Sequence, residues 1–308
     1  MKRTLLAALR LLTHLLVRPY RPKKPPSRTV AIVVPASART ELIPEEEVSM
    51  RHLLHFLGPY DKFLVTPPGA SVRREGFRVV KFPHKFFGST AAHNQLMIWP
   101  GFYRTFRDYE YILIYHLDSL VFSEELDHWC RAGLDYIGAP WLPCPETPWV
   151  KEARVGNGGF TLMKVETVLK VLHNRYRQEP TSYWVDLLMR NNLSLRPFFQ
   201  ILRWLQSAFP ESRIVNRPLE DLRKTERPDI HGCANDYFWS FQAVRFLPEF
   251  KIAGVEQGLR FAFEAAPRTC FELAGGRMPF GCHAWTKFDR SFWEPHLLMS
   301  EQIARHHG

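Results

Sequence analysis

A single carboxylate, Asp118, follows an apolar run in this sequence, at a position where a sheet protein could bind a ligand. The run at residues 111–115 reads Tyr-Ile-Leu-Ile-Tyr, which is typical of a buried parallel strand. Open α/β sheets bind their ligands beyond the carboxyl ends of such strands, so Asp118 could face a ligand, directly or through a metal ion. It could equally cap the turn that follows, and this stretch alone leaves both interpretations open.

Three further groups of residues could do chemistry, and each also has a purely structural interpretation. Gly156, Gly158 and Gly159 precede an apolar strand, where the backbone must approach something closely or adopt positive φ. A hairpin turn would explain the same glycines. Asp236 stands at the start of an aromatic helix, where it could serve a site or act as the N-cap. His283 lies beside glycine and tryptophan and could be a ligand or a packing residue.

The composition describes a globular protein with reduced cysteines. The chain has 308 residues, of which 45% are apolar and 14% aromatic, enough to bury a full core and to exclude general disorder. Five cysteines form no Cys-x-x-Cys pair and leave one residue over. A disulfide framework or a finger-type zinc site is therefore not expected, and this cysteine usage fits a reducing, cytoplasmic compartment.

The formal charge of +10 is concentrated at one end of the chain. Eight basic residues and no acid precede Thr29, which leaves only +2 for the remainder. Nucleic-acid binding needs a basic face on the folded body, so the near-neutral body argues against it.

The first 28 residues are expected to form a basic amphipathic segment and a Pro-rich linker. The apolar stretch at 5–17 is interrupted by Arg10 and His14, and it is shorter than the roughly 20 residues of a membrane-spanning helix. As a helix it would place its bases on one stripe and leucines elsewhere, which is typical of contact with an anionic membrane surface. A packed or frayed terminal helix and a signal peptide are the alternatives.

The next part of the chain alternates strands and helices. Gly58-Pro59 ends one helix, and Pro100 interrupts another. Alternation of this kind predicts an α/β fold with a doubly wound, mostly parallel sheet flanked by helices. Strands are expected at residues 30–35, 63–66, 77–82 and 111–115, and helices at 44–57 and 91–106.

Beyond Asp118 the alternation loosens. A helical insertion is expected at 183–209, followed by a charged loop at 212–229. The remaining expectations are a short strand and turn at 135–141, a glycine-rich strand entry at 156–163, and helices at 237–241 and 255–263.

In this order, the four features resemble the hallmarks of the GT-A glycosyltransferase fold: an Asp-x-Asp motif, a glycine-rich loop, an x-Glu-Asp motif and a C-terminal metal-binding histidine. The amino-acid sequence around these features is most similar to the DUF5672 family of presumed bacterial and fungal glycosyltransferases. The resemblance spans about residues 30–285. The segments that carry it are 115–122, 135–141, 155–160, 235–236 and 280–283.

The resemblance implies a role for each matching residue. His116 and Asp118 occupy the Asp-x-Asp place, with His116 instead of the first acid, so this motif cannot supply two carboxylates. Asp118 and His283 would hold a divalent metal, Mn²⁺ or Mg²⁺, and His116 would hydrogen-bond the donor ribose.

The other matching residues would line the donor sugar and supply the base. The loop from Gly156 to Gly159, which includes Asn157, matches the lining of the donor-sugar pocket. Asn235 and Asp236 match the Glu-Asp pair, with Asn for Glu, and Asp236 would be the catalytic base.

The function implied is transfer of a sugar from a nucleotide-diphosphate donor to a saccharide or lipid-linked acceptor, with inversion. Residues 29–308 would form one GT-A-like domain, with a nucleotide-binding half at about 29–122 and an acceptor and catalytic half at about 123–290. The chain would be cytoplasmic and in peripheral contact with the inner membrane.

Two alternatives remain from the sequence. A catalytically degenerate protein of the same fold would bind a nucleotide or glycan without transfer, which the missing first Asp and the missing Glu allow. A metal-dependent hydrolase would use Asp118, His283 and His231, but acids around these motifs are sparse.

Overall fold

The computed structural model describes residues 11–22, 25–36, 39, 41–148, 150–179 and 234–298, with single positions at 183, 187, 200, 204, 207, 208 and 210. The expected helical insertion at 183–209 lies outside these residues apart from the single positions. The expected charged loop at 212–229, His231 and the first ten residues lie outside them entirely.

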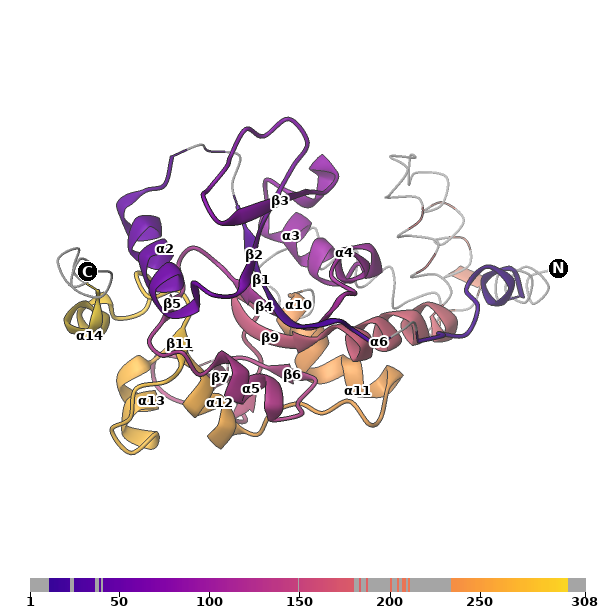
Figure 1. Cartoon of the computed structure of the whole chain (residues 1–308). Coiled ribbons are helices and arrows are strands. Elements are labelled where there is room, and N and C mark those ends of the chain that lie inside the picture. Colours follow the sequence, from indigo (N-terminus) through magenta and orange to yellow (C-terminus); the bar gives the residue numbers. More distant parts are fainter. Residues whose placement is uncertain are drawn as a thin grey trace.

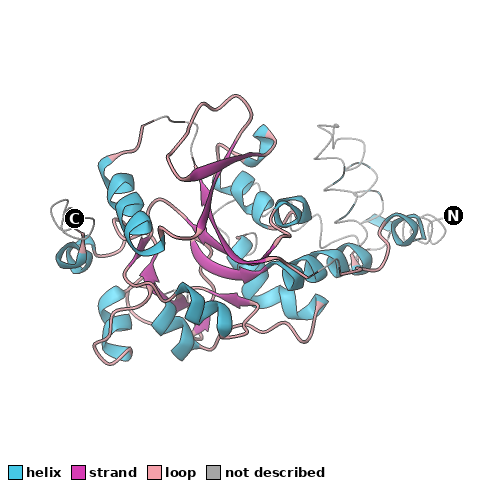
Figure 2. Cartoon of the chain, in the orientation of Figure 1, coloured by secondary structure: helices cyan, strands magenta, loops and turns pink. Residues whose placement is uncertain are grey.

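A six-stranded mixed sheet forms the centre of the molecule, with helices packed on both of its faces (Figures 1 and 2). Its strand order is β3-β2-β1-β4-β9-β6. The first four strands in this order are parallel, and β9 is antiparallel to both β4 and β6. The strands are β1 (Arg28–Pro35), β2 (Asp61–Thr66), β3 (Phe77–Lys81), β4 (Tyr109–Tyr115), β6 (Tyr136–Ile137) and β9 (Phe160–Lys164). The predicted α/β fold with a mostly parallel sheet is confirmed.

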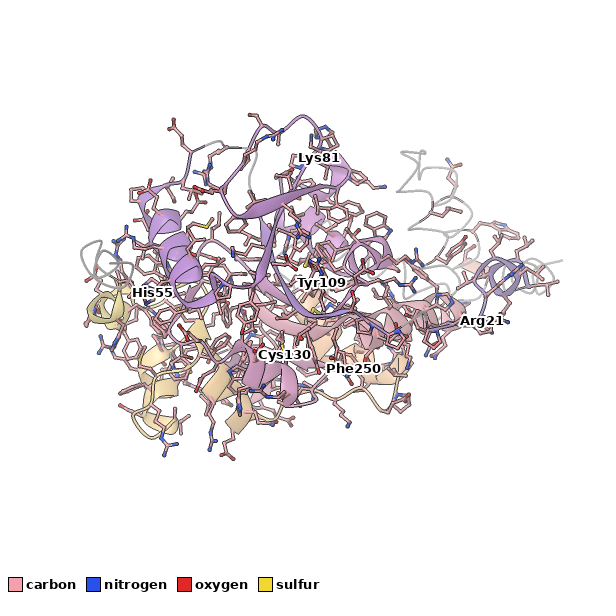
Figure 3. The ribbon with its side chains drawn as sticks, viewed as in Figure 1. Arg21, His55, Lys81, Tyr109, Cys130 and Phe250 are labelled. Carbon is pink, nitrogen blue, oxygen red and sulfur yellow. The ribbon has the colours of Figure 1, made fainter. Side chains whose placement is uncertain are left out.

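The most apolar strands lie in the middle of this sheet. Ile32 and Val33 of β1 and Leu113 of β4 are completely buried, as continuous apolar runs covered on both faces should be. Strand β3 lies at the edge and is largely exposed. Side chains fill the space between the layers, among them Tyr109 and Phe250, which are labelled in Figure 3.

Several helices begin where local chemistry predicts. Pro44 opens α2 with three acidic residues in its first turn, and Pro100 separates α3 from α4. The expected helix at 255–263 is two residues shorter, because Ala262–Phe263 pair with β11 as a strand instead. The helices are α2 (Pro44–Leu57), η1 (His84–Phe86), α3 (Thr90–Met97), α4 (Pro100–Thr105), α5 (Leu126–Arg131), α6 (Val165–Gln178), α10 (Asn235–Tyr237), η2 (Phe238–Gln242), α11 (Ala243–Phe246), α12 (Val255–Phe261), α13 (Pro267–Leu273), α14 (Arg290–Trp293) and η3 (Glu294–His296).

Two small sheets complete the fold. Strand β10 (Ala262–Phe263) pairs with β11 (Gly281–Cys282), which pairs in turn with β5 (Leu120–Val121). Strand β7 (Pro140–Trp141) pairs with β8 (Arg154–Val155). The first of these sheets joins the segment directly after Asp118 to the segment directly before His283.

The N-terminal segment at residues 11–22 packs against α6 (Figure 1). Val17 is buried, and its carbonyl oxygen accepts a hydrogen bond from Arg177. The hydroxyl of Tyr20 donates a 2.5 Å hydrogen bond to Glu166. Among the described residues, no helix combines the length and apolar content needed to cross a membrane.

Candidate functional site

Asp118, His283 and His116 meet at the carboxyl end of β4. The Nε2 atom of His283 lies 3.3 Å from Oδ1 of Asp118, and the rings of His116 and His283 are 5.3 Å apart between centroids. One ligand atom from each of the three residues lies within 4.8 Å of the others. The Asp118 side chain therefore faces His283, as the ligand interpretation requires.

The pairing of β5 with β11 brings Asp118 and His283 together, although they are far apart in the sequence. Strand β5 begins two residues after Asp118, and its Leu120 pairs with Cys282, the residue before His283. The backbone N–H of Trp285 donates to the carbonyl oxygen of Asp118 at 3.1 Å. These bonds fix the two side chains on the same edge of the structure.

The charges of Asp118 and His283 stabilise each other. Burial alone would raise the pKa of Asp118, but the hydrogen bond to His283 and its charge lower that pKa to about 2. Burial alone would lower the pKa of His283, but hydrogen bonds to Asp118 and Glu264 raise it to about 10. Without a metal, His283 is thus an imidazolium between two carboxylates. A metal bound at Nε2 would replace the proton on that nitrogen.

Glu264 completes the environment of His283, and the sequence did not reveal it. Its Oε1 accepts a 2.8 Å hydrogen bond from Nδ1 of His283, and both side chains are 15% exposed. A carboxylate bound to the outer nitrogen of a metal-ligating histidine fixes its tautomer and orientation. The available signal was a lone acid in the apolar stretch at 261–266.

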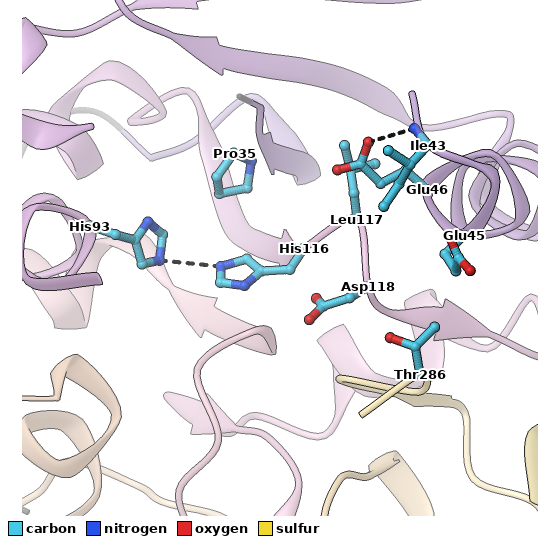
Figure 4. A pocket seen from close by; sticks show the side chains of 9 residues that line it. All are labelled: Pro35, Ile43, Glu45, Glu46, His93, His116, Leu117, Asp118 and Thr286. Carbon is cyan, nitrogen blue, oxygen red and sulfur yellow. Dashed lines mark hydrogen bonds between the residues drawn. The ribbon is translucent and has the colours of Figure 1, made fainter. Parts of the chain in front are cut away.

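His116 is held by a second residue that the sequence did not reveal, His93 of α3. Their Nε2 atoms lie 3.2 Å apart, as the dashed line in Figure 4 shows. Burial lowers the pKa of His93 to about 4, and burial together with nearby imidazoles lowers the pKa of His116 well below its ordinary value. Both rings are therefore neutral, one donating and the other accepting. With Nε2 engaged by His93, Nδ1 is the nitrogen of His116 left to bind a metal.

The glycine-rich loop approaches the site closely, as one of the two interpretations predicted. A Cβ added to Gly159 would overlap the His283 ring, and one added to Gly158 would lie 2.9 Å from Oδ1 of Asn235. Neither glycine adopts positive φ. Asn157 closes the loop, because its Oδ1 accepts a 3.0 Å hydrogen bond from the backbone of Gly159.

Asp236 lies beside this loop and is half-buried. The expected N-cap role is wrong, because α10 begins at Asn235 with Ala234 at the N-cap, so Asp236 is already inside the first turn. Burial raises the pKa of Asp236 to about 7, and the charge of Glu264 adds to this effect. A carboxylate with a pKa close to neutrality is suited to general base catalysis.

A pocket of about 490 Å³ opens at the carboxyl ends of β1 and β4, where open α/β sheets bind ligands (Figure 4). On the α2 side of the pocket, the Glu46 carboxylate is already hydrogen-bonded within the protein. It accepts from the backbone N–H of Ile43 at 3.1 Å and from Arg39 at 2.8 Å. The pocket is lined by Pro35, Ile43, Glu45, Glu46, His93, His116, Leu117, Asp118 and Thr286.

The donor atoms fit a divalent transition metal. One carboxylate and two imidazoles that can bind in their neutral form suit Mn²⁺ and the heavier transition metals better than Ca²⁺ or Mg²⁺, which prefer oxygen ligands. Hydrogen bonds with Glu264 and His93 orient the rings of His283 and His116, as is usual for histidines that bind metals. Among the described residues, His116, Asp118 and His283 are the cluster with suitable spacing.

Comparison with known proteins gives one family match and distant similarities to solved structures, among them GlyE and LgtC. The model of the family described as "Protein of unknown function (DUF5672)" matches residues 76–283. The apo-form glycosyltransferase GlyE of Streptococcus pneumoniae TIGR4 is 12% identical, with a TM-score of 0.41, over 89% of this chain and 61% of GlyE. Galactosyltransferase LgtC, in complex with donor and acceptor sugar analogs, is 13% identical, with a TM-score of 0.42, over 89% of this chain and 99% of LgtC. A search of curated proteins finds no match.

Proposed function

The chain belongs to the DUF5672 family, and we propose from the chemistry of its site that it is a glycosyltransferase acting on a nucleotide-diphosphate sugar. One observation carries the proposal. Asp118, His283, the glycine-rich loop and Asp236 come from four separate segments and form one chain of contacts, which starts at Asp118 in the wall of the pocket. Asp118 lies next to His283, Gly159 packs on the His283 ring, and Gly158 lies next to Asp236. The acceptor would be a saccharide or a lipid-linked sugar.

The metal-binding residues would act on the departing diphosphate. Asp118, His283 and His116 would hold a divalent metal, which when bound neutralises the negative charge that grows on the leaving oxygens. Glu264 and His93 keep the two imidazoles in place. Asn157 holds the loop at Gly159 against His283, where the backbone would contact the donor sugar.

Asp236 would accept the proton of the acceptor hydroxyl. As that oxygen bonds to the anomeric carbon, the bond from this carbon to the diphosphate oxygen breaks and the proton passes to the carboxylate. The transition state is oxocarbenium-like, as in glycoside hydrolysis. Direct displacement by an acceptor activated at Asp236 inverts the anomeric centre, so product stereochemistry tests this assignment.

A catalytically degenerate binding protein of the same fold is the second candidate. It is favoured by His116 in place of the first acid and by Asn235 in place of the Glu. Asn235 is also held by Asn94, whose Oδ1 accepts from its side-chain amide at 2.9 Å. Such a protein would bind the nucleotide with metal but would not turn over its sugar ester.

A thermal-shift panel of UDP, GDP, CDP and dTDP, each with and without Mn²⁺, tests the proposal. We expect one nucleotide to stabilise the protein only with metal, by about 2.7 kcal/mol at a hundredfold excess over its Kd. Its sugar ester should then be consumed with an acceptor present. Stabilisation without turnover would favour the degenerate candidate, and stabilisation by no nucleotide would contradict both.

We also propose that the N-terminal segment, which is helical at residues 11–16, contacts an anionic membrane surface, with the folded body in the cytoplasm. Four leucines on this helix are between 47% and 65% exposed, although Val17 and Tyr20 hold the segment on α6. Exposed leucines close to a cluster of bases can insert between headgroups. The leucines are Leu11, Leu12, Leu15 and Leu16.

Replacing Leu11 and Leu15 by Glu is therefore expected to reduce sedimentation with phosphatidylserine vesicles several-fold, because both apolar burial and charge attraction are lost. Leu273→Glu is the matched control, since Leu273 is 61% exposed on α13. These substitutions are preferable to deletion of residues 1–28, which would also remove Tyr20 from α6. Equal sedimentation of all variants would exclude membrane contact through this helix.

A further inference from the structure

Three aromatic side chains form a near-parallel stack beside Asp236. Tyr237 and Phe241 lie 4.5 Å apart between ring centroids, with 25° between their planes. Trp141 lies 6.2 Å from Phe241, with 13° between the planes. Phe241 is 37% exposed, whereas most phenylalanines of the described part of the chain are buried or half-buried.

Specific contacts hold this stack in one arrangement. The guanidinium of Arg154 lies 4.4 Å over the Phe241 ring, while its Nη2 donates to the carbonyl oxygen of Ser240 at 2.6 Å. Trp141 faces Arg154 across the β7–β8 pair. A π-helical turn, η2, carries Phe241 one turn beyond Tyr237. Turns of this kind occur frequently at functional sites.

The stack contacts both the segment of Asp236 and the glycine-rich loop. Tyr237 follows Asp236 directly, and the Trp141 ring packs so closely on Gly156 that this position has no room for a Cβ. The pocket at Asp118 is lined by other residues, and none of the three rings belongs to it. A donor nucleotide in that pocket would leave the aromatic stack free for a different ligand.

We propose that the stack of Trp141, Tyr237 and Phe241 is the acceptor subsite and that it binds a pyranose ring of a saccharide. The assignment rests on the proposed transfer reaction, since the acceptor hydroxyl must reach Asp236. A pyranose has an apolar C–H face and a polar rim, so it packs on rigid aromatic surfaces that lose little entropy on binding. The sugar contacts Phe241, the most exposed of the three rings, together with its neighbours Trp141 and Tyr237. Arg154 holds the Phe241 ring in place.

Binding can be measured without any reaction, by ¹⁹F NMR of protein labelled with 5-fluorotryptophan. Trp141→Phe identifies the Trp141 resonance. Methyl β-D-glucopyranoside and methyl β-D-galactopyranoside are the probes, with open-chain sorbitol and the nucleoside uridine as controls. We expect at least one pyranoside to shift this resonance and the controls to leave it unchanged. No shift, an equal shift with sorbitol, or a shift with uridine alone overturns the proposal.

Kinetics then assign the subsite to the acceptor. Trp141→Leu and Tyr237→Leu are expected to raise the acceptor KM about tenfold and the donor KM much less. Trp141→Phe should recover most of the loss, and Phe271→Leu on α13 is the matched control. A rise in the donor KM instead would overturn the acceptor assignment. If no sugar nucleotide is consumed but a pyranoside still shifts the Trp141 resonance, the proposed glycosyltransferase function is wrong and the saccharide-binding surface is retained.

Discussion

Asp236→Asn is expected to lower the turnover number by about 10² to 10⁴ and to leave metal-dependent nucleotide binding intact. Asn keeps the shape of the side chain but cannot accept the proton of the acceptor hydroxyl. Turnover of the wild-type protein should rise with pH up to about 7, because the base is protonated below its pKa. The measurement is kcat against pH for both proteins, with the nucleotide affinity determined separately.

The same substitution is expected to stabilise the fold at alkaline pH. The pKa of Asp236 is raised from 3.8 to about 7 on folding, so the folded protein holds a proton that the unfolded chain releases. Stability is thereby lost as pH rises through this window, and the loss is complete above 7. Asn does not ionise, so Asp236→Asn should raise the free energy of unfolding by up to about 4 kcal/mol at pH 8 and by little at pH 4. Thermal unfolding at both pH values measures the difference.

Asp108→Asn provides the control for both measurements, because Asp108 is exposed on a loop remote from the pocket. It should change neither turnover nor the pH dependence of stability. An Asp236→Asn protein with wild-type turnover, or a product with retained stereochemistry, would remove Asp236 from the role of base.

Asp118→Asn is expected to abolish the part of nucleotide binding that depends on metal. Asp118 is the carboxylate of the three-residue cluster, so its loss leaves two imidazoles to hold a cation. The affinity for nucleotide in Mn²⁺ should fall by about 100-fold or more, since removal of outer partners alone costs 10- to 100-fold. Isothermal titration with and without Mn²⁺ measures the loss independently of activity.

Glu264→Gln tests whether Glu264 supports the metal ligand His283 without binding the metal itself. Gln can still accept the hydrogen bond from Nδ1 of His283 but carries no charge, so an affinity loss of about 10-fold is expected. Nucleotide binding by wild-type protein should be stronger with Mn²⁺ than with Mg²⁺, because imidazole nitrogens supply part of the site. Equal binding in Mg²⁺, or unchanged binding by Asp118→Asn, would contradict the metal role.

Short-range sequence patterns were sufficient to predict the central strands and the starts of several helices. The continuous apolar runs around Ile32 and Leu113 predicted central strands, and Pro44 and Pro100 predicted where helices begin. These signals succeed because they depend on near neighbours in the chain. The close approach at Gly159 was predicted as one of two possibilities, and only the position of His283 decides between them.

The rest of the site depends on contacts that no local pattern encodes. His93 lies on α3 as an ordinary helical residue, and it gains its role only because β4 brings His116 within 3.2 Å. Glu264 likewise follows a two-residue strand whose partner is β11. The N-cap interpretation of Asp236 failed because the helix begins at Asn235, two residues before the expected start at Tyr237.

The pairing of β5 with β11 has a consequence for the order in which the protein assembles. The parallel strands β1, β2, β3 and β4 lie within the first 115 residues and can pair as soon as that part of the chain is made. Contacts between Leu120 and Cys282 close a much longer loop, and such distant contacts form slowly. A nascent chain that stops before β11 could therefore contain the sheet, His116 and Asp118 but would lack His283, one of the three residues proposed to hold the metal. Maturation of the site would then be a late step, separable in time from folding of the sheet.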